Sequence, residues 1–123
     1  MSTLLELELL GLPPTLNQMY RNRGHYRYKT GAVQAYQRYA TKKLRDEWGN
    51  RPAYTGAVSL SVKLMTKDKR RWDIDNRVKA LQDCLSIGGV IEDDSQIDEL
   101  HVKRERREKT ATYIALKSLD DKL

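Results

Sequence analysis

Two acidic clusters stand out in this basic sequence, Asp73-Ile74-Asp75 and Glu92-Asp93-Asp94. If the segment around Ile74 is extended, residues two apart point to the same side, and both carboxylates face one cation. Carboxylates held close together repel each other, and a divalent cation removes that penalty. Mg²⁺ prefers hard oxygen ligands, and a surrounding basic surface would hold phosphates. The clusters therefore predict metal-assisted attack of water on a phosphodiester.

The same residues also have structural interpretations. Asp73 or Asp75 can cap the helix predicted to follow, because a side-chain acceptor is favoured at that position. Asp93 and Asp94 can belong to an ordinary solvated turn. Short motifs match by chance often enough that spacing alone leaves both interpretations open.

Lys79 lies four residues after Asp75, one helical turn further on the same face. One interpretation is a surface ion pair with Asp75. The other places the ammonium beside the scissile phosphate, where it offsets charge developing in the transition state. Asn76 and Asp83 share this face, either as supporting residues or as exposed ones.

The segment from residue 15 to residue 31 has little apolar periodicity and predicts a long loop. Its basic residues alternate with tyrosines, which suits contact with DNA phosphates and stacking on unpaired bases. A polar loop without function is the alternative. The candidate DNA contacts are Arg21, Arg23 and Arg27 in this loop, Arg70 and Arg71 in a basic turn, and Asn76.

Composition limits the class of protein. With 123 residues, the chain predicts a single domain over residues 1–123. Its net charge of +6 favours a polyanionic partner, although solubility alone also explains a mild excess of cations. Cys84 is the only cysteine, which rules out an intrachain disulfide. No apolar run could span a bilayer and no signal pattern is present, so we expect a cytoplasmic protein without a membrane partner.

The remaining pattern supplies the elements that position these residues. Alternating apolar residues predict strands at 5–9 and 58–64, and helical spacing predicts helices at 33–48 and 75–85. Two further strands, at 96–104 and 110–117, follow closely enough to predict a hairpin. This order predicts a two-layer α+β domain, with one sheet and helices packed on one face.

The two acidic clusters also carry a resemblance. The stretch 73–85, DIDNRVKALQDCL, joined to 89–97, GVIEDDSQI, resembles the signature of the RusA-type Holliday-junction resolvases. The opening 13–21, PPTLNQMYR, resembles the start of the same family. The likeness covers nearly the whole chain and implies a small RusA-like mixed sheet. One departure is Trp72, because the residue before the first aspartate is often basic in this family.

The resemblance implies an Mg²⁺-dependent endonuclease that nicks four-way DNA junctions in recombination and repair. Mn²⁺ is a possible substitute ion, since both ions accept oxygen ligands. The resemblance places the metal-binding and catalytic triad on Asp73, Asp75 and Asp94, and the catalytic lysine on Lys79. It also implies a homodimer, which suits a junction of approximate two-fold symmetry. A non-catalytic protein that binds branched DNA on the same fold is the alternative.

Overall fold

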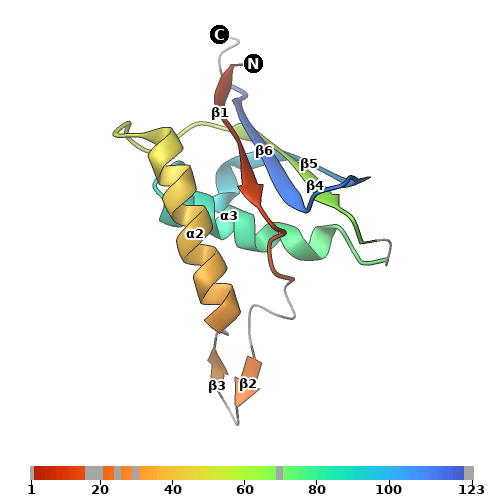
Figure 1. The fold of residues 1–123 in the computed structure, drawn as a ribbon. Coiled ribbons are helices and arrows are strands. Elements are labelled where there is room, and N and C mark those ends of the chain that lie inside the picture. The colour runs from red at the N-terminus through yellow and green to blue at the C-terminus, as the bar shows by residue number, and fades with distance from the viewer. Residues whose placement is uncertain (1, 16–20, 24–25, 29–30, 69–70, 121–123) are drawn as a thin grey trace.

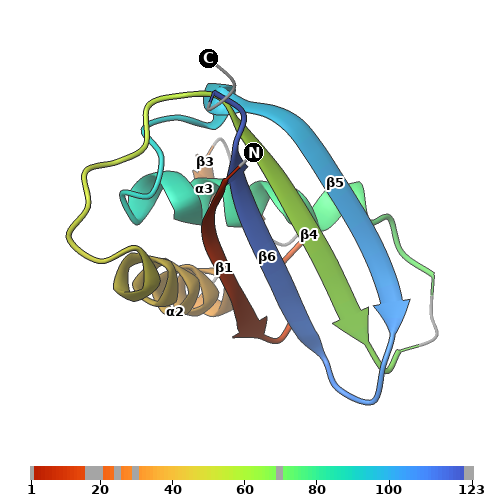
Figure 2. The ribbon, with the colours of Figure 1, turned by 90° about the horizontal axis from the view of Figure 1, so that it is seen from above.

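The computed structural model describes residues 2–15, 21–23, 26–28, 31–68 and 71–120. Four strands form the main sheet in the order β1-β6-β4-β5, with bounds β1 (Thr3–Leu10), β4 (Val58–Thr66), β5 (Ile97–Arg106) and β6 (Ala111–Ser118). Helices α2 (Gly31–Trp48) and α3 (Val78–Ile87) lie on the same side of this sheet (Figures 1 and 2). The predicted two-layer α+β architecture with a mixed sheet is confirmed.

Strand β4 is the centre of the sheet. It pairs antiparallel with β6 and parallel with β5, and most of its side chains are buried. A parallel pair needs a crossover connection, and α3 provides it between β4 and β5. The residues that follow β4 and those that precede β5 are therefore attached to the two ends of one helix.

The predicted hairpin between the last two strands is wrong. Strands β5 and β6 follow each other in the chain, but β4 lies between them in the sheet. Two strand spacings amount to about 9.6 Å, which four extended residues can cross, so the short connection 107–110 does not require adjacency. The backbone N–H of Arg107 donates to the carbonyl of Thr66 at 3.0 Å, which fixes this crossing at the end of β4.

Both helices pack their apolar sides against the sheet. Val78, Leu81 and Leu85 of α3 are buried, as their spacing predicts, and Leu44 and Trp48 of α2 join the same core. Each helix is followed by a glycine in the left-handed region, Gly49 after α2 and Gly89 after α3. Gly88 and Gly89 therefore end the second helix.

The region predicted as a long loop is not a loop throughout. Strands β2 (Arg21–Arg23) and β3 (Tyr26–Tyr28) pair antiparallel and form a separate two-stranded sheet. Tyrosine favours strands, and its alternation with arginine offers no apolar face that would have revealed a strand in the sequence. Figure 1 places this small sheet beyond the N-terminal end of α2.

No described helix is both long enough and apolar enough to cross a membrane.

Candidate active site

Helix α3 presents a polar face that carries most of the predicted site. Lys79 and Asp83 lie one turn apart on it, and Ser86 continues the same face toward the helix end. Val78, Leu81 and Leu85 on the opposite side are buried in the core. Because one side of the helix is fixed by packing, its polar side is held in a defined direction toward solvent.

Asp94 is brought to this face from a different part of the chain. It begins the 3₁₀ turn η2 (Asp94–Gln96), which leads into β5. One carboxylate oxygen accepts a hydrogen bond from the Ser86 hydroxyl at 2.9 Å, and the other accepts from the Lys79 ammonium at 2.8 Å. Residues 79, 86 and 94 therefore form a connected cluster.

Lys79 bridges two carboxylates. Its Nζ lies 2.7 Å from Oδ1 of Asp83 and 2.8 Å from Oδ2 of Asp94. The hydrogen bonds that the Lys79 ammonium donates to Asp83 and to Asp94 raise its pKa above the ordinary value, so it stays charged across the physiological range. The predicted pair with Asp75 is not formed, because the lysine turns toward the C-terminal end of its helix.

Gln96 anchors the segment that carries Asp94. Its Oε1 accepts hydrogen bonds from the backbone N–H groups of Glu92 and Asp93, at 2.8 and 3.0 Å. Its Nε2 donates to the carbonyls of Tyr54 and Gly56, at 2.6 and 2.9 Å. Two of these hydrogen bonds thus brace the turn from within, and the other two tie it to the segment that leads into β4.

The turn has a further internal brace. The Asp93 side chain accepts from the backbone N–H of Ser95 at 2.9 Å, and with Gln96 it forms a capping box. These hydrogen bonds to the charged form lower the pKa of the Asp93 carboxyl. In the second acidic cluster, Asp93 therefore has a structural role, and Asp94 is the residue that faces α3.

Asp73 and Asp75 lie in the connection from β4 to α3. Both are exposed, and their carboxylates make no hydrogen bond or ion pair with any residue that the structure describes. Neither caps a helix, because η1 (Asp75–Arg77) and α3 both begin without a side-chain cap. The capping interpretation is thus wrong, and no structural role accounts for the two carboxylates.

The segment that holds this pair is not extended. Ile74 has φ −69° and ψ −33°, in the right-handed helical region, so the same-side argument for residues two apart does not apply. Ile74 itself packs against the core. The chain turns at this residue directly into η1.

Trp72 holds in place the backbone that immediately precedes Asp73. Its ring packs against the core, and the guanidinium carbons of Arg77 and Arg104 lie 4.8 and 4.9 Å from its centroid. Arg104 also donates to the Trp72 carbonyl at 2.6 Å, and Arg77 donates to the carbonyl of Pro13 at 2.7 Å. The aromatic residue that departs from the family pattern is therefore a packed and braced one.

The predicted convergence of Asp73, Asp75 and Asp94 is not formed. Within the described parts of the chain, no three side chains of His, Cys, Asp or Glu gather in a way that could hold a metal ion. Carboxylates without a cation repel one another, and here Lys79 holds Asp94 instead. The donor chemistry nevertheless suits Mg²⁺, which needs only one or two protein carboxylates besides water and phosphate oxygens.

The predicted DNA contacts are only partly described. The backbones of Arg21, Arg23 and Arg27 lie in β2 and β3, but their side chains lie outside the described parts of the chain, as does all of Arg70. Arg71 is exposed beside the acidic pair, and Asn76 is half-buried in η1. The structure thus places two of the six candidates beside the acidic pair.

Sequence reasoning missed two residues of the site, Ser86 and Gln96. Gln96 carries a recognisable signal, because an aspartate followed three residues later by glutamine is the pattern of a capping box. Ser86 lies seven residues after Lys79, at the spacing of two helical turns, and this periodicity was the available signal. Its partner Asp94 lies outside the helix, so the contact itself has no local signal.

Known proteins resemble this chain over most of its length. The profile of the family described as "Endodeoxyribonuclease RusA" matches residues 11–117. The chain belongs to the RusA family. A curated relative from Aquifex aeolicus, "Crossover junction endodeoxyribonuclease RusA", is 31% identical over 92% of this chain and 90% of its own length. A relative of the same name from Enterobacteria phage HK97 is 34% identical over 78% of this chain and 79% of its own length.

Membership of the RusA family confirms the resemblance seen in the motifs. The matched range includes both acidic clusters, Lys79 and the turn that carries Asp94. It also includes Ser86 and Gln96, so the whole cluster described above lies within the part of the chain shared with this endodeoxyribonuclease family.

Proposed function

We propose that this protein is a metal-dependent endonuclease that resolves four-way DNA junctions by paired nicks. The observation that carries the proposal is a pair of acidic arrangements that flank one helix. Lys79, Asp83 and Ser86 of α3 form a cluster with Asp94 of η2, and the exposed pair Asp73 and Asp75 comes shortly before α3. In a chain of an endodeoxyribonuclease family, these groups supply the charges that phosphodiester hydrolysis needs.

Each residue has a proposed role. Asp73 and Asp75 would hold a divalent cation, with Asp94 as the third ligand, and Mg²⁺ or Mn²⁺ would suit the oxygen donors. The ion, when bound, lowers the pKa of a water that attacks phosphorus. Lys79 supplies positive charge for the phosphate, and Ser86 orients the carboxylate of Asp94.

The proposal extends to assembly and cellular role. A symmetric pair of nicks on a junction calls for two active sites related by a two-fold axis, so the protein would act as a homodimer. Cleavage of junctions would place it in DNA recombination and repair, and its site of action would be the cytoplasm. Its two relatives are named for action on crossover junctions.

A junction cleavage assay tests the proposal. The protein is incubated with a labelled synthetic four-way junction and with linear duplex of the same sequence, with Mg²⁺ or with EDTA. We expect paired nicks on the junction only, and only with the metal. A flap substrate in the same assay tests whether the preference is for junctions rather than for branches in general.

One observation favours a second candidate, a junction-binding protein without nuclease activity. The three predicted ligands do not form a metal-holding group among the described residues. Binding of the junction without products, in both Mg²⁺ and Mn²⁺, would support this candidate and contradict the nuclease.

A further inference from the structure

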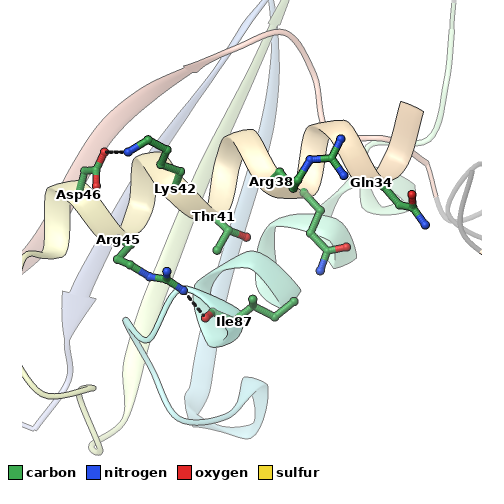
Figure 3. Close-up of a pocket in the computed structure, with 8 residues that line it drawn as sticks. Gln34, Arg38, Thr41, Lys42, Arg45, Asp46 and Ile87 are labelled. Atoms are coloured by element: carbon green, nitrogen blue, oxygen red, sulfur yellow. Dashed lines mark hydrogen bonds and ion pairs between the residues drawn. The ribbon is translucent and has the colours of Figure 1, made fainter. Parts of the chain in front are cut away.

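A groove lined mostly by polar and charged residues runs between α2 and the C-terminal end of α3, on the helical side of the molecule. Its volume is about 540 Å³. Figure 3 shows the side chains that line it, which come from three turns of α2 and from the last residue of α3. The lining residues are Gln34, Gln37, Arg38, Thr41, Lys42, Arg45, Asp46 and Ile87.

The groove carries an excess of positive charge. Arg38, Lys42 and Arg45 are exposed along it, and Asp46 is the one carboxylate among the lining residues. Asp46 pairs with Lys42 at 3.1 Å, and the Arg45 guanidinium donates across to the Ile87 carbonyl at 3.3 Å. The groove therefore presents cations and amide groups, which suit an anionic ligand.

The spacing of the three cations suits a regular polyanion. Positions 38, 42 and 45 fall on one side of α2 and span about 10 Å along its axis. This distance equals the rise of about three nucleotides along one strand of a DNA duplex. A row of phosphates can thus meet the row of cations without a change of helix geometry.

The groove adjoins the proposed active face. Gln37 lines the groove and also a small recess next to it, whose wall includes Asp83. Asp83 is one of the two carboxylates that hold Lys79, and Ile87 on the groove wall follows Ser86, which holds Asp94. A ligand in the groove therefore lies beside the C-terminal end of the helix that carries Lys79 and Ser86.

We propose that this groove seats the phosphodiester backbone of one DNA arm and directs it toward the α3 face. The inference rests on the proposed function, since it takes DNA as the substrate. A second copy of this chain is the less suitable occupant. A two-fold interface would place the patch against itself and bring its three cations together.

Binding measurements test the inference. Arg38→Gln/Arg45→Gln removes two groove cations. The control, Lys43→Gln/Lys109→Gln, removes two exposed cations, one on the opposite side of α2 and one in the turn before β6. Junction and duplex affinities are measured by fluorescence anisotropy in EDTA at several salt concentrations, with wild type alongside.

We expect the groove variant to bind at least tenfold more weakly than the control at low salt. Its slope of log affinity against log salt should also fall by about 0.9 for each phosphate that the groove no longer neutralises. Equal affinities and equal slopes in the two variants would overturn the inference.

Sedimentation velocity tests the other occupant. A groove variant that dissociates into monomers, while wild type and control remain dimers, would show that a second copy fills the groove and would overturn the inference. The proposed function fails separately. If wild type never cleaves junctions, but the groove variant still loses affinity relative to the control, the nuclease is excluded and the groove assignment stands.

Discussion

The two halves of the proposed active site are built in opposite ways. Asp94 is held by Lys79 and Ser86, and Gln96 fixes its turn by accepting two hydrogen bonds and donating two. Asp73 and Asp75 are exposed and have no described partner for their carboxylates. The fixed carboxylate of Asp94 follows α3 in the chain, and the exposed carboxylates of Asp73 and Asp75 precede it.

This difference between the two halves shows which carboxylates gain most from binding a metal ion. Bringing two carboxylates together without a cation is unfavourable, and a divalent ion that drew Asp73 and Asp75 together would offset their repulsion. The Asp94 half has a resident cation already, since the Lys79 ammonium neutralises it. We infer that Asp73 and Asp75 are the part of the site that rearranges when a metal ion binds. Asp94 is already fixed in position by its hydrogen bonds.

The largest expected loss of cleavage comes from removing a carboxylate of the exposed pair, Asp73 and Asp75. Asp75→Asn keeps the size of the side chain and removes its charge. We expect junction cleavage in Mg²⁺ to fall by at least about 10³-fold, because a metal ligand is removed. Junction affinity in EDTA should stay within about threefold of wild type or increase, because one repulsive charge is gone.

Asp98→Asn is the matched control for Asp75→Asn, since it removes an exposed carboxylate of β5 that the proposal does not place among the metal ligands. Its cleavage rate should equal that of wild type. An Asp75→Asn protein that cleaves as fast as the control would remove Asp75 from the mechanism.

A smaller loss of cleavage is expected from a change in the hydrogen-bonded half of the site, around Asp94. Lys79→Met keeps the aliphatic stem and leaves Asp83 and Asp94 without their shared ammonium. We expect single-turnover cleavage to fall by about 10²-fold, the usual cost of one electrostatic group at a developing charge. Lys79→Arg, which keeps the charge, should recover part of the rate.

The pH profile sharpens the assignment of Lys79. Its partners raise the pKa of the ammonium above its ordinary value, so protonation and its stabilising effect are complete below the unfolded pKa. That contribution is lost only as pH rises beyond the raised, folded value. Cleavage by wild type between pH 7 and 10 should therefore show no decline from Lys79, and a decline absent from Lys79→Arg would contradict this protonation state.

These contrasts also show how far the sequence could predict the molecule. Periodicity located β1, β4 and both long helices, because each has one apolar side that must be buried. It did not reveal that β4 lies between β5 and β6, since pairing partners are set by contacts far apart in the chain. The family motif supplied the candidate site residues, and the structure leaves their metal-binding role a prediction.

Two local details were beyond the sequence for a physical reason. Lys79 has a carboxylate one turn away on either side, at Asp75 and Asp83, and spacing cannot say which one it pairs with. The additional bond to Asp94 decides the outcome, and it depends on tertiary structure. The helical conformation of Ile74, which turns Asp73 and Asp75 away from an extended arrangement, is likewise invisible in the pattern.

The smallest effect on catalysis is expected from Gln96, which touches no reacting group but fixes the Asp94 turn. Gln96→Ala leaves two N–H groups and two carbonyls without this partner. We expect the free energy of unfolding to fall by about 1–3 kcal/mol, as for loss of a capping box and part-buried hydrogen bonds. Cleavage should fall only several-fold, because Lys79 and Ser86 still hold the carboxylate of Asp94.

Urea denaturation measures the first effect of Gln96→Ala and single-turnover cleavage the second. Gln34→Ala, on the exposed side of α2, is the control for stability and should change it by less than about 0.5 kcal/mol. If Gln96→Ala instead abolishes cleavage while leaving stability intact, the glutamine acts on the reaction directly. Gln96 would then belong to the reacting groups, and its role would not be limited to fixing the turn that carries Asp94.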